Sequence, residues 1–194
     1  MDPKQRRRNT RERELARKIK ALPRRRFGLL YVDPPWRFQP YSRITGMDRA
    51  ADNHYPTMTT KEIAALKVPA APDCVLYLWA TAPMLRDALD VMSAWGFTYK
   101  SHMVWIKNHQ GTGYWFRNQH ELLLIGTRGR VPAPAPGTQW SSALHAPRSA
   151  HSVKPSAVRR MLERQFPTTP KLEMFARGGR IRGWTRWGAE VEDE

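Results

Sequence analysis

The sequence has little cysteine and no long apolar segment, and each shortage excludes a class of protein. One cysteine among 194 residues, Cys74, cannot form an intrachain disulfide or supply a cysteine-based zinc cluster. No stretch approaches the roughly 18 apolar residues that cross a membrane, and the N-terminus lacks the apolar region of a signal peptide. These absences predict a cytoplasmic protein that does not enter a membrane.

Acidic residues are scarce as well. Asp and Glu number 17 against 33 Lys and Arg, which gives a formal net charge of +16 and a pI near 10.8. Such a charge does not fit an ordinary metabolic enzyme, and it favours a polyanionic partner, most simply nucleic acid. The length and the 41% hydrophobic content fit one globular domain with a sizeable core.

Much of the excess charge lies in residues 1–26, which hold twelve Lys or Arg and only three acidic residues. A helix is predicted from Thr10 to about Leu22, where a proline follows. We predict a phosphate-binding arm over residues 1–26 and a folded domain over residues 27–194. The alternative is a solvated basic tail without a specific role.

The segment Asp33-Pro34-Pro35-Trp36 follows an apolar run, Phe27 to Val32, that has the length and composition of a strand. The prolines fix φ and have no N–H to donate, so the segment presents two acceptors, the Asp33 carboxylate and the Pro34 carbonyl, beside an indole. Two acceptors that hold both N–H groups of an aromatic amine would orient its nitrogen for attack on an electrophile. The alternative is a strand that ends in a Pro-Pro turn with a tryptophan packed below it.

Apolar runs of strand length alternate with helical periodicity along the rest of the chain. The predicted strands cover residues 75–81, 99–107, 121–127 and 171–177, with a short edge strand within 140–145. The predicted helices cover 62–66, opened by a capping box at Thr59, then 84–95 and 156–165. This alternation is typical of an α/β domain with a largely parallel sheet, whose ligands sit at the carboxyl ends of the strands. Asp33 stands at such an end.

Residues 108–120 form a loop between two of these strands. It contains two glycines, several amides, Arg117 and three successive aromatic residues that begin at Tyr114. Such side chains can contact a flipped base and the strand that flanks it. The alternative is a turn whose aromatic rings pack back on the core.

Taken in order, these segments resemble the MT-A70-type adenine methyltransferases. This family transfers a methyl group from S-adenosylmethionine to the 6-amino group of adenine in DNA or RNA. The resemblance runs from about Phe27 to Glu190 and rests on Asp33-Pro34-Pro35-Trp36, Asn53-His54-Tyr55-Pro56-Thr57-Met58, Leu78-Trp79-Ala80-Thr81, Trp95-Gly96-Phe97, Gly113-Tyr114-Trp115 with Glu121, His151-Ser152-Val153-Lys154-Pro155, Glu173-Met174-Phe175-Ala176-Arg177 and Trp187-Gly188-Ala189-Glu190.

The resemblance implies an α/β, Rossmann-like S-adenosylmethionine-dependent methyltransferase fold in permuted order, with the catalytic motif first. It implies that Asp33, Pro34 and Pro35 form the part of the motif that holds the adenine amine, and that Trp36 or a neighbouring aromatic stacks on the base. The implied substrate contacts are Tyr55, Tyr114, Trp115, Glu121 and Lys154. The implied cofactor contacts are Asp33, Lys154, Phe175, Arg177, Gly179, Arg180, Ala189 and Glu190. A sulfonium methyl group needs no metal.

Two departures from the family pattern concern the cofactor pocket. Relatives often have an acidic residue on an extra strand before the catalytic strand, where this chain has only its arginine-rich arm. Relatives also commonly have Asn at the position of Ala189, and the loss of that amide would weaken cofactor binding by about 1 kcal/mol. Neither change affects Asp33, so an active enzyme is expected.

The compact form of the chain resembles the prokaryotic or phage branch, in which DNA is the usual substrate. We therefore expect a DNA adenine methyltransferase that acts as a monomer, as a homodimer or with a partner subunit. One alternative is an RNA adenine methyltransferase that uses the same residues. The other is a non-catalytic nucleic-acid-binding member of the fold, although such members lose the acidic or aromatic residue of the tetrapeptide, and Asp33 and Trp36 are both present.

Overall fold

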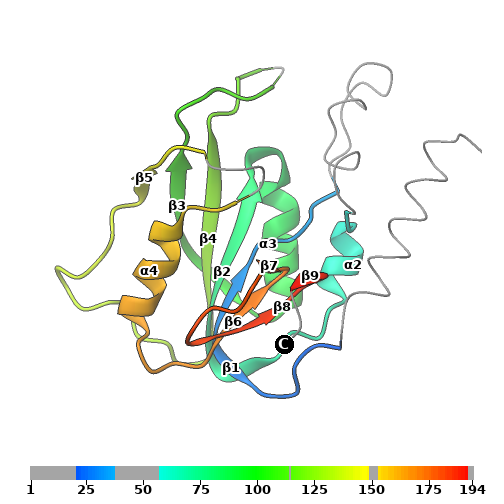
Figure 1. Ribbon diagram of the computed structural model, residues 1–194, viewed down its shortest axis with the longest axis vertical. Coiled ribbons are helices and arrows are strands. Elements are labelled where there is room, and N and C mark those ends of the chain that lie inside the picture. The colour runs from blue at the N-terminus through cyan, green and yellow to red at the C-terminus, as the bar shows by residue number, and fades with distance from the viewer. Residues whose placement is uncertain (1–20, 38–56, 114, 149–152, 192–194) are drawn as a thin grey trace, which may run out of the picture.

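The computed structural model describes residues 21–37, 57–113, 115–148 and 153–191, which form a sheet with helices on both faces (Figure 1). Within these residues the main sheet has the strand order β5-β3-β4-β2-β1-β6-β8. Its strands are β1 (Phe27–Val32), β2 (Ala70–Thr81), β3 (Thr98–Ile106), β4 (His120–Arg128), β5 (Ala143–His145), β6 (Lys171–Met174) and β8 (Trp184–Trp187). A separate ribbon pairs β7 (Arg177–Gly178) with β9 (Glu190–Val191). The predicted α/β class is confirmed.

Strand β4 runs antiparallel to both of its neighbours, whereas the other strand pairs of the main sheet are parallel. The reason lies in the connection, because residues 107–119 join β3 to β4 without the crossover helix that parallel neighbours need. The reversal brings the start of β4 to the edge at which the other strands end. Glu121 is therefore paired with Thr81 at the end of β2.

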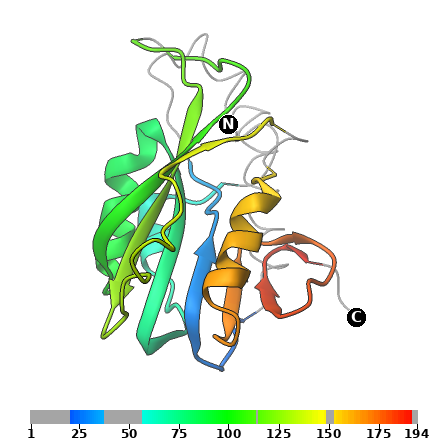
Figure 2. The same cartoon turned by 90° about the vertical axis from the view of Figure 1, so that its left-hand side faces the viewer.

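Side chains that alternate along the central strands divide the core into two halves. Helices α2 (Thr60–Ala64) and α3 (Leu85–Ala94) cover one face, with a 3-10 turn, Ala82–Met84, before α3; helix α4 (Ser156–Gln165) covers the other face (Figure 2). On β1, Leu30 belongs to the α3 side and Leu29 to the α4 side, and both are fully buried. Such burial on both faces is expected of a central parallel strand.

The strand predicted over residues 171–177 ends early, at Met174. The cause is Phe175, whose φ of 59° lies in the left-handed region, which an extended strand cannot contain. The chain bends there and pairs again only as β7. Strand β2 is longer than predicted, because it begins at Ala70 rather than at residue 75.

Some sequence predictions fall beyond the described residues. The helix predicted from Thr10 lies outside them except for Ala21 and Leu22, which are not helical. Within the part of the chain that the structure covers, no helix combines the length and the apolar character needed to cross a bilayer.

Helix α2 opens with the predicted capping box. The Thr59 hydroxyl accepts from the backbone N–H of Glu62 at 3.2 Å, and the Glu62 carboxylate accepts from the Thr59 N–H at 2.7 Å and from its hydroxyl at 2.8 Å. The bonds from Thr59 lower the pKa of Glu62 below its usual value. This cap therefore stabilises the fold at neutral pH and loses strength as the pH falls through that lowered pKa.

Thr59→Ala should lower the free energy of unfolding by about 1 kcal/mol at pH 7, because the N–H of Glu62 loses its acceptor. Urea denaturation measures the change. Lys61→Ala, on the exposed side of the same helix, is the control and should stay within about 0.5 kcal/mol of wild type. Equal stability of wild type and Thr59→Ala would contradict the role of the cap.

Candidate active site

Three adjacent strands, β1, β6 and β8, end at the same level of the sheet, because their last residues are paired with one another. Asp33, Phe175 and Gly188 each follow directly after one of these ends. After β1 the chain continues to β2, which lies beside β1 on the side away from β6. After β6 it continues to β8, which lies beside β6 on the side away from β1. A topological switch point therefore lies between β1 and β6, which is where α/β proteins bind ligands.

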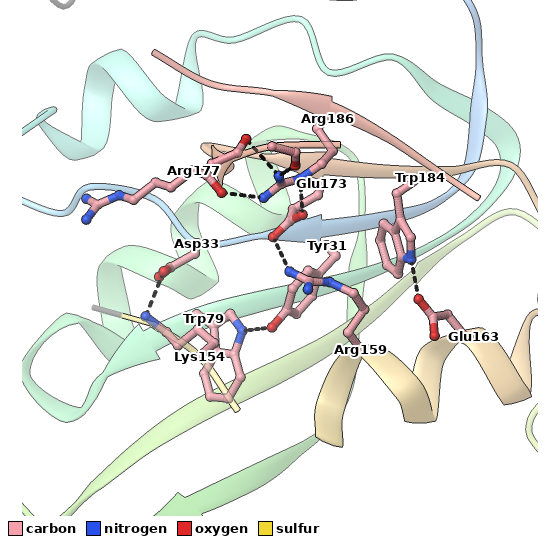
Figure 3. A network of polar contacts seen from close by, with 12 residues as sticks. Tyr31, Asp33, Trp79, Lys154, Arg159, Glu163, Glu173, Arg177, Trp184 and Arg186 are labelled. Atoms are coloured by element: carbon pink, nitrogen blue, oxygen red, sulfur yellow. Dashed lines mark hydrogen bonds and ion pairs between the residues drawn. The ribbon is translucent and has the colours of Figure 1, made fainter. Parts of the chain in front are cut away.

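Four charged side chains form a continuous chain of ion pairs at this edge. Lys154 Nζ lies 2.7 Å from Asp33 Oδ2 and 3.4 Å from Glu121 Oε2 (the first contact is drawn in Figure 3). The other oxygen of Glu121 accepts from Lys107 Nζ at 2.5 Å. The sequence predicted Asp33, Glu121 and Lys154, and the structure brings all three together. It did not point to Lys107, which stands as the last residue of a predicted strand with no sign of its partner.

Burial and alternating charge set the protonation of this chain. Burial lowers the pKa of Lys154, but the carboxylates of Asp33 and Glu121 outweigh it and leave that pKa above its usual value. Burial raises the pKa of Glu121, but Lys154 and Lys107 outweigh it and leave that pKa below its usual value. Burial also raises the pKa of Asp33, and Lys154 offsets this only in part. The net effect on Asp33 therefore disfavours its ionised form, whereas the two lysines favour the ionised form of Glu121.

Tryptophan rings lie against both lysines. Lys154 Nζ is 5.5 Å from the centre of the Trp79 ring, and Lys107 Nζ is 4.9 Å from that of Trp105. The two rings meet edge to face at 6.0 Å, and the Trp79 indole N–H donates to the Tyr31 hydroxyl at 2.8 Å (Figure 3). These buried rings keep water from the inner side of the ion pairs and present favourable π faces to the cations.

The tetrapeptide is fixed by hydrogen bonds. The Trp36 N–H donates to the Pro34 carbonyl at 2.8 Å, the Met58 N–H donates to the Pro35 carbonyl at 2.8 Å, and the Trp36 indole N–H donates to the Trp79 carbonyl at 2.9 Å. The Pro34 carbonyl keeps a second lone pair for a substrate amine. Trp36 is only 8% exposed, which agrees with the alternative in which this tryptophan packs below a Pro-Pro turn. Its stacking role stays a prediction, and the packing shows it as an anchor.

A turn at residues 175–179 follows β6 and is held by Arg186. This guanidinium donates to the carbonyl oxygens of residues 177–179, and its Nε donates to Glu173 Oε2 at 2.8 Å (Figure 3). Glu173 Oε1 in turn accepts from Arg159 of α4 at 2.9 Å. The sequence did not reveal this support, because a chain so rich in arginine gives no sign of which arginine is buried against carbonyl groups.

The turn is strained and closely packed. Phe175 has a left-handed backbone, which costs a bulky residue about 1–3 kcal/mol, and its ring meets that of Trp187 edge to face at 5.2 Å. A Cβ atom at Gly188 would lie 2.3 Å from the Ala176 carbonyl oxygen, so only glycine fits there. A strained backbone that its surroundings hold in place is typical of ligand-binding turns.

The remaining predicted cofactor residues lie around this turn. Arg177 is exposed on it, and Arg180 is exposed directly after it. Gly179 contributes one of the carbonyls bound by Arg186, and Ala189 is half-buried after β8. The backbone of Glu190 pairs with Arg177 between β9 and β7.

Two predicted substrate residues, Tyr55 and Tyr114, lie outside the described residues. Trp115 is described and is 96% exposed. The alternative in which the loop aromatics pack back on the core is therefore wrong for Trp115.

Comparison with known proteins gives the same family that the sequence motifs resemble. The MT-A70 family model matches residues 27–190. The chain is 33% identical to the type II methyltransferase M.MunI of Mycoplasma sp, and the match covers 98% of this chain and 88% of that protein.

More distant matches are found among eukaryotic proteins. The chain is 28% identical to the N(6)-adenosine-methyltransferase MT-A70-like protein of Drosophila melanogaster and 26% identical to the N(6)-adenosine-methyltransferase catalytic subunit METTL3 of Homo sapiens. Each match covers 86% of this chain but only 27% and 28% of the respective relative. The chain thus spans nearly all of M.MunI and roughly a quarter of these longer proteins.

Glu121→Gln should lower the free energy of unfolding at pH 7 by about 2–3 kcal/mol, because two largely buried lysines lose their shared carboxylate. The pKa of Glu121 is lowered in the folded protein, so its contribution is present above the ordinary glutamate pKa of about 4.3 and is lost as the pH falls through the lowered value. The difference between the two proteins should therefore shrink in acid.

Urea denaturation of both proteins at pH 7 and in acid tests this. Asp90→Asn removes an exposed carboxylate on α3 and serves as the control. A difference of the same size at both pH values would rule out the ion-pair explanation.

Proposed function

The chain belongs to the MT-A70 family, and we propose how its site methylates the 6-amino group of adenine in DNA. The observation that carries the proposal is the position of the Asp33–Lys154–Glu121 ion pairs beside the turn at residues 175–179. The acceptors at Asp33 that would bind the amine and the turn after β6 that would bind the methyl donor thus adjoin at one switch point. Similarity to the type II methyltransferase M.MunI over nearly the whole of both chains favours DNA as the substrate.

S-adenosylmethionine is the methyl donor in this proposal, and the turn after β6 fits such a ligand. When bound, it supplies an electrophilic methyl group on a sulfonium sulfur. The strained Phe175, the exposed backbone around it and the close approach at Gly188 are the features of a fixed ligand cradle. The residues that would hold the donor are Lys154, Phe175, Arg177, Gly179, Arg180, Ala189 and Glu190.

The adenine amine is held by acceptors after β1. Asp33 accepts one amine N–H and the Pro34 carbonyl accepts the other, which orients the nitrogen lone pair. Lys154 fixes the Asp33 carboxylate, and Glu121 fixes Lys154. Burial gives Asp33 a raised pKa, so it is a better proton acceptor than an ordinary aspartate and receives the proton that the methylated amine releases.

Phosphate contacts outside this site hold the nucleic acid in this proposal. We assign this role to the basic arm, residues 1–26, which adds charge to an already basic domain over residues 27–194. Because phosphate contacts carry no sequence information, the arm contributes affinity, and base contacts near Asp33 select the adenine.

The first test of this function is transfer of a radiolabelled methyl group from S-adenosylmethionine to double-stranded DNA, single-stranded DNA and RNA in parallel, with mass spectrometry for 6-methyladenine. DNA should be labelled. Asp33→Ala should lower the rate at least about 100-fold, because the amine loses its main acceptor, while the affinity for nucleic acid stays the same. Asp90→Ala is the matched control. Labelling of RNA alone would refute the DNA assignment, and full activity of Asp33→Ala would refute the mechanism.

Arg186→Lys should weaken S-adenosylmethionine binding about tenfold, because a lysine cannot reproduce the fork that binds the carbonyls of the turn and Glu173 together. The KM for nucleic acid should not change. Arg182→Lys, an exposed arginine of the same region, is the control. Isothermal titration with S-adenosylmethionine measures the effect, and equal affinity of wild type and Arg186→Lys would show that the turn does not bind the donor.

A further inference from the structure

The loop between β3 and β4 carries two aromatic side chains that nothing in the described structure covers. Trp115 is 96% exposed and its neighbour Phe116 is 86% exposed. Among the described residues, the other exposed large hydrophobic side chains are between 37% and 51% exposed. Two adjacent aromatic rings held in water at a loop tip mark a contact site for a partner.

The base of this loop is ordered by its own hydrogen bonds. Lys107 and Gln119 are joined by two bonds, one from the Lys107 N–H at 2.8 Å and one from the Gln119 side chain at 2.9 Å. Further along, the Gly111 N–H donates to the Asn118 carbonyl at 2.7 Å, and the Asn118 N–H donates to that of Thr112 at 3.3 Å. The aromatic pair therefore stands on a closed stem.

The chain also folds tightly just before the pair. Arg117 Nε donates back to the Gly111 carbonyl at 3.2 Å. A Cβ atom at Gly113 would lie only 1.9 Å from the Phe116 carbonyl oxygen, so this turn requires glycine. Gly113 and the bond from Arg117 therefore fix the backbone that carries the two exposed rings.

The stem is anchored in the active site. Lys107, its first residue, is the lysine whose side chain pairs with Glu121, and Glu121 pairs with Lys154 beside Asp33. The loop leaves from the edge at which the parallel strands end, and both cartoon views show it extending beyond that edge (Figures 1 and 2). A partner that contacts the tip therefore also reaches toward the catalytic carboxylate.

Charge identifies the partner. Arg117 lies exposed within the loop, and the exposed Arg148 is held beside the base of the loop because its backbone N–H donates to Asn108 Oδ1 at 3.1 Å. The carboxylate near the base of the loop, Glu121, is already paired with two lysines. Such a surface attracts a polyanion, whereas a second copy of a chain with a net charge of +16 would be repelled by it. Nucleic acid is also the partner whose stacked bases accept an aromatic ring on either face.

We propose that Trp115 and Phe116 form a wedge that inserts between stacked bases of a DNA duplex next to the target adenine. This proposal rests on the proposed function and adds the step that makes the adenine accessible. Enzymes that modify a base must take it out of the duplex, and an inserted apolar side chain replaces the stacking that is lost. The wedge thus favours the extruded adenine, and it is needed only when the target lies within a duplex.

The test compares wild type with the double variant Trp115→Ala, Phe116→Ala on plasmid DNA that is either native or heat-denatured, so that no target sequence need be known. The variant should lose at least about tenfold in methyl transfer on native DNA, a loss of the size expected for one base–aromatic stack. On denatured DNA it should remain within about threefold of wild type. Trp140→Ala, a half-exposed tryptophan on another loop, should behave as wild type on both.

Two outcomes would overturn the wedge, one in the activity assay and one in a sedimentation measurement. Equal losses on native and denatured DNA would mean that the rings serve general binding or folding. A change of oligomeric state in the double variant, measured by sedimentation, would mean that the tip is a contact between copies of the chain.

A second readout does not depend on catalysis. The emission of Trp115, taken as the difference between wild type and Trp115→Leu, should be quenched when a short random-sequence DNA duplex is added. Quenching without methyl transfer to any polymer would refute the proposed function and support the wedge. Methyl transfer to duplex DNA without quenching would support the function and overturn the wedge.

Discussion

The site depends on one lysine shared by two carboxylates. Lys154 lies against Asp33 and Glu121 with its side chain only 12% exposed. Taking such ions out of water costs several kcal/mol each unless opposite charges meet them at close range. These side chains come from the end of β1, the start of β4 and the segment before α4. Only the reversed direction of β4 brings the second carboxylate, Glu121, to this edge, so the charge pairing requires the antiparallel strand found in the described part of the sheet.

Helix α4 links the two halves of the site. Lys154, just before it, completes the ion pairs with Asp33 and Glu121, and Arg159, within it, pairs with Glu173. Glu173 in turn orients Arg186, which holds the turn at residues 175–179. One helix thus links the proposed acceptors for the amine with the proposed binding turn for the methyl donor, as in-line transfer between them would require.

Local patterns in the sequence were enough for the elements that carry this arrangement. The bounds of β1 and α4 and the capping box at Thr59 agree with the prediction because an apolar run, a helical period and a cap are readable within a few residues. The direction of β4, the pairing of Lys107 and the left-handed Phe175 were not predicted, since each depends on contacts between distant segments. The tetrapeptide pointed to Asp33, but only packing shows that Trp36 is buried.

The pairing of Asp33 and Glu121 with lysines also bears on the protonation of these two carboxylates in a basic protein that binds a polyanion in the proposed function. Phosphates that approach the site disfavour further negative charge and so raise the proton affinity of nearby carboxylates. Glu121 has two lysines and a lowered pKa, so it stays ionised and keeps Lys154 in place. Asp33 has one lysine, and burial leaves its pKa above the usual value. Unequal pairing thus favours the ionised form of Glu121 and gives Asp33 a greater proton affinity than an ordinary aspartate, which is the property that the proposed proton acceptor requires.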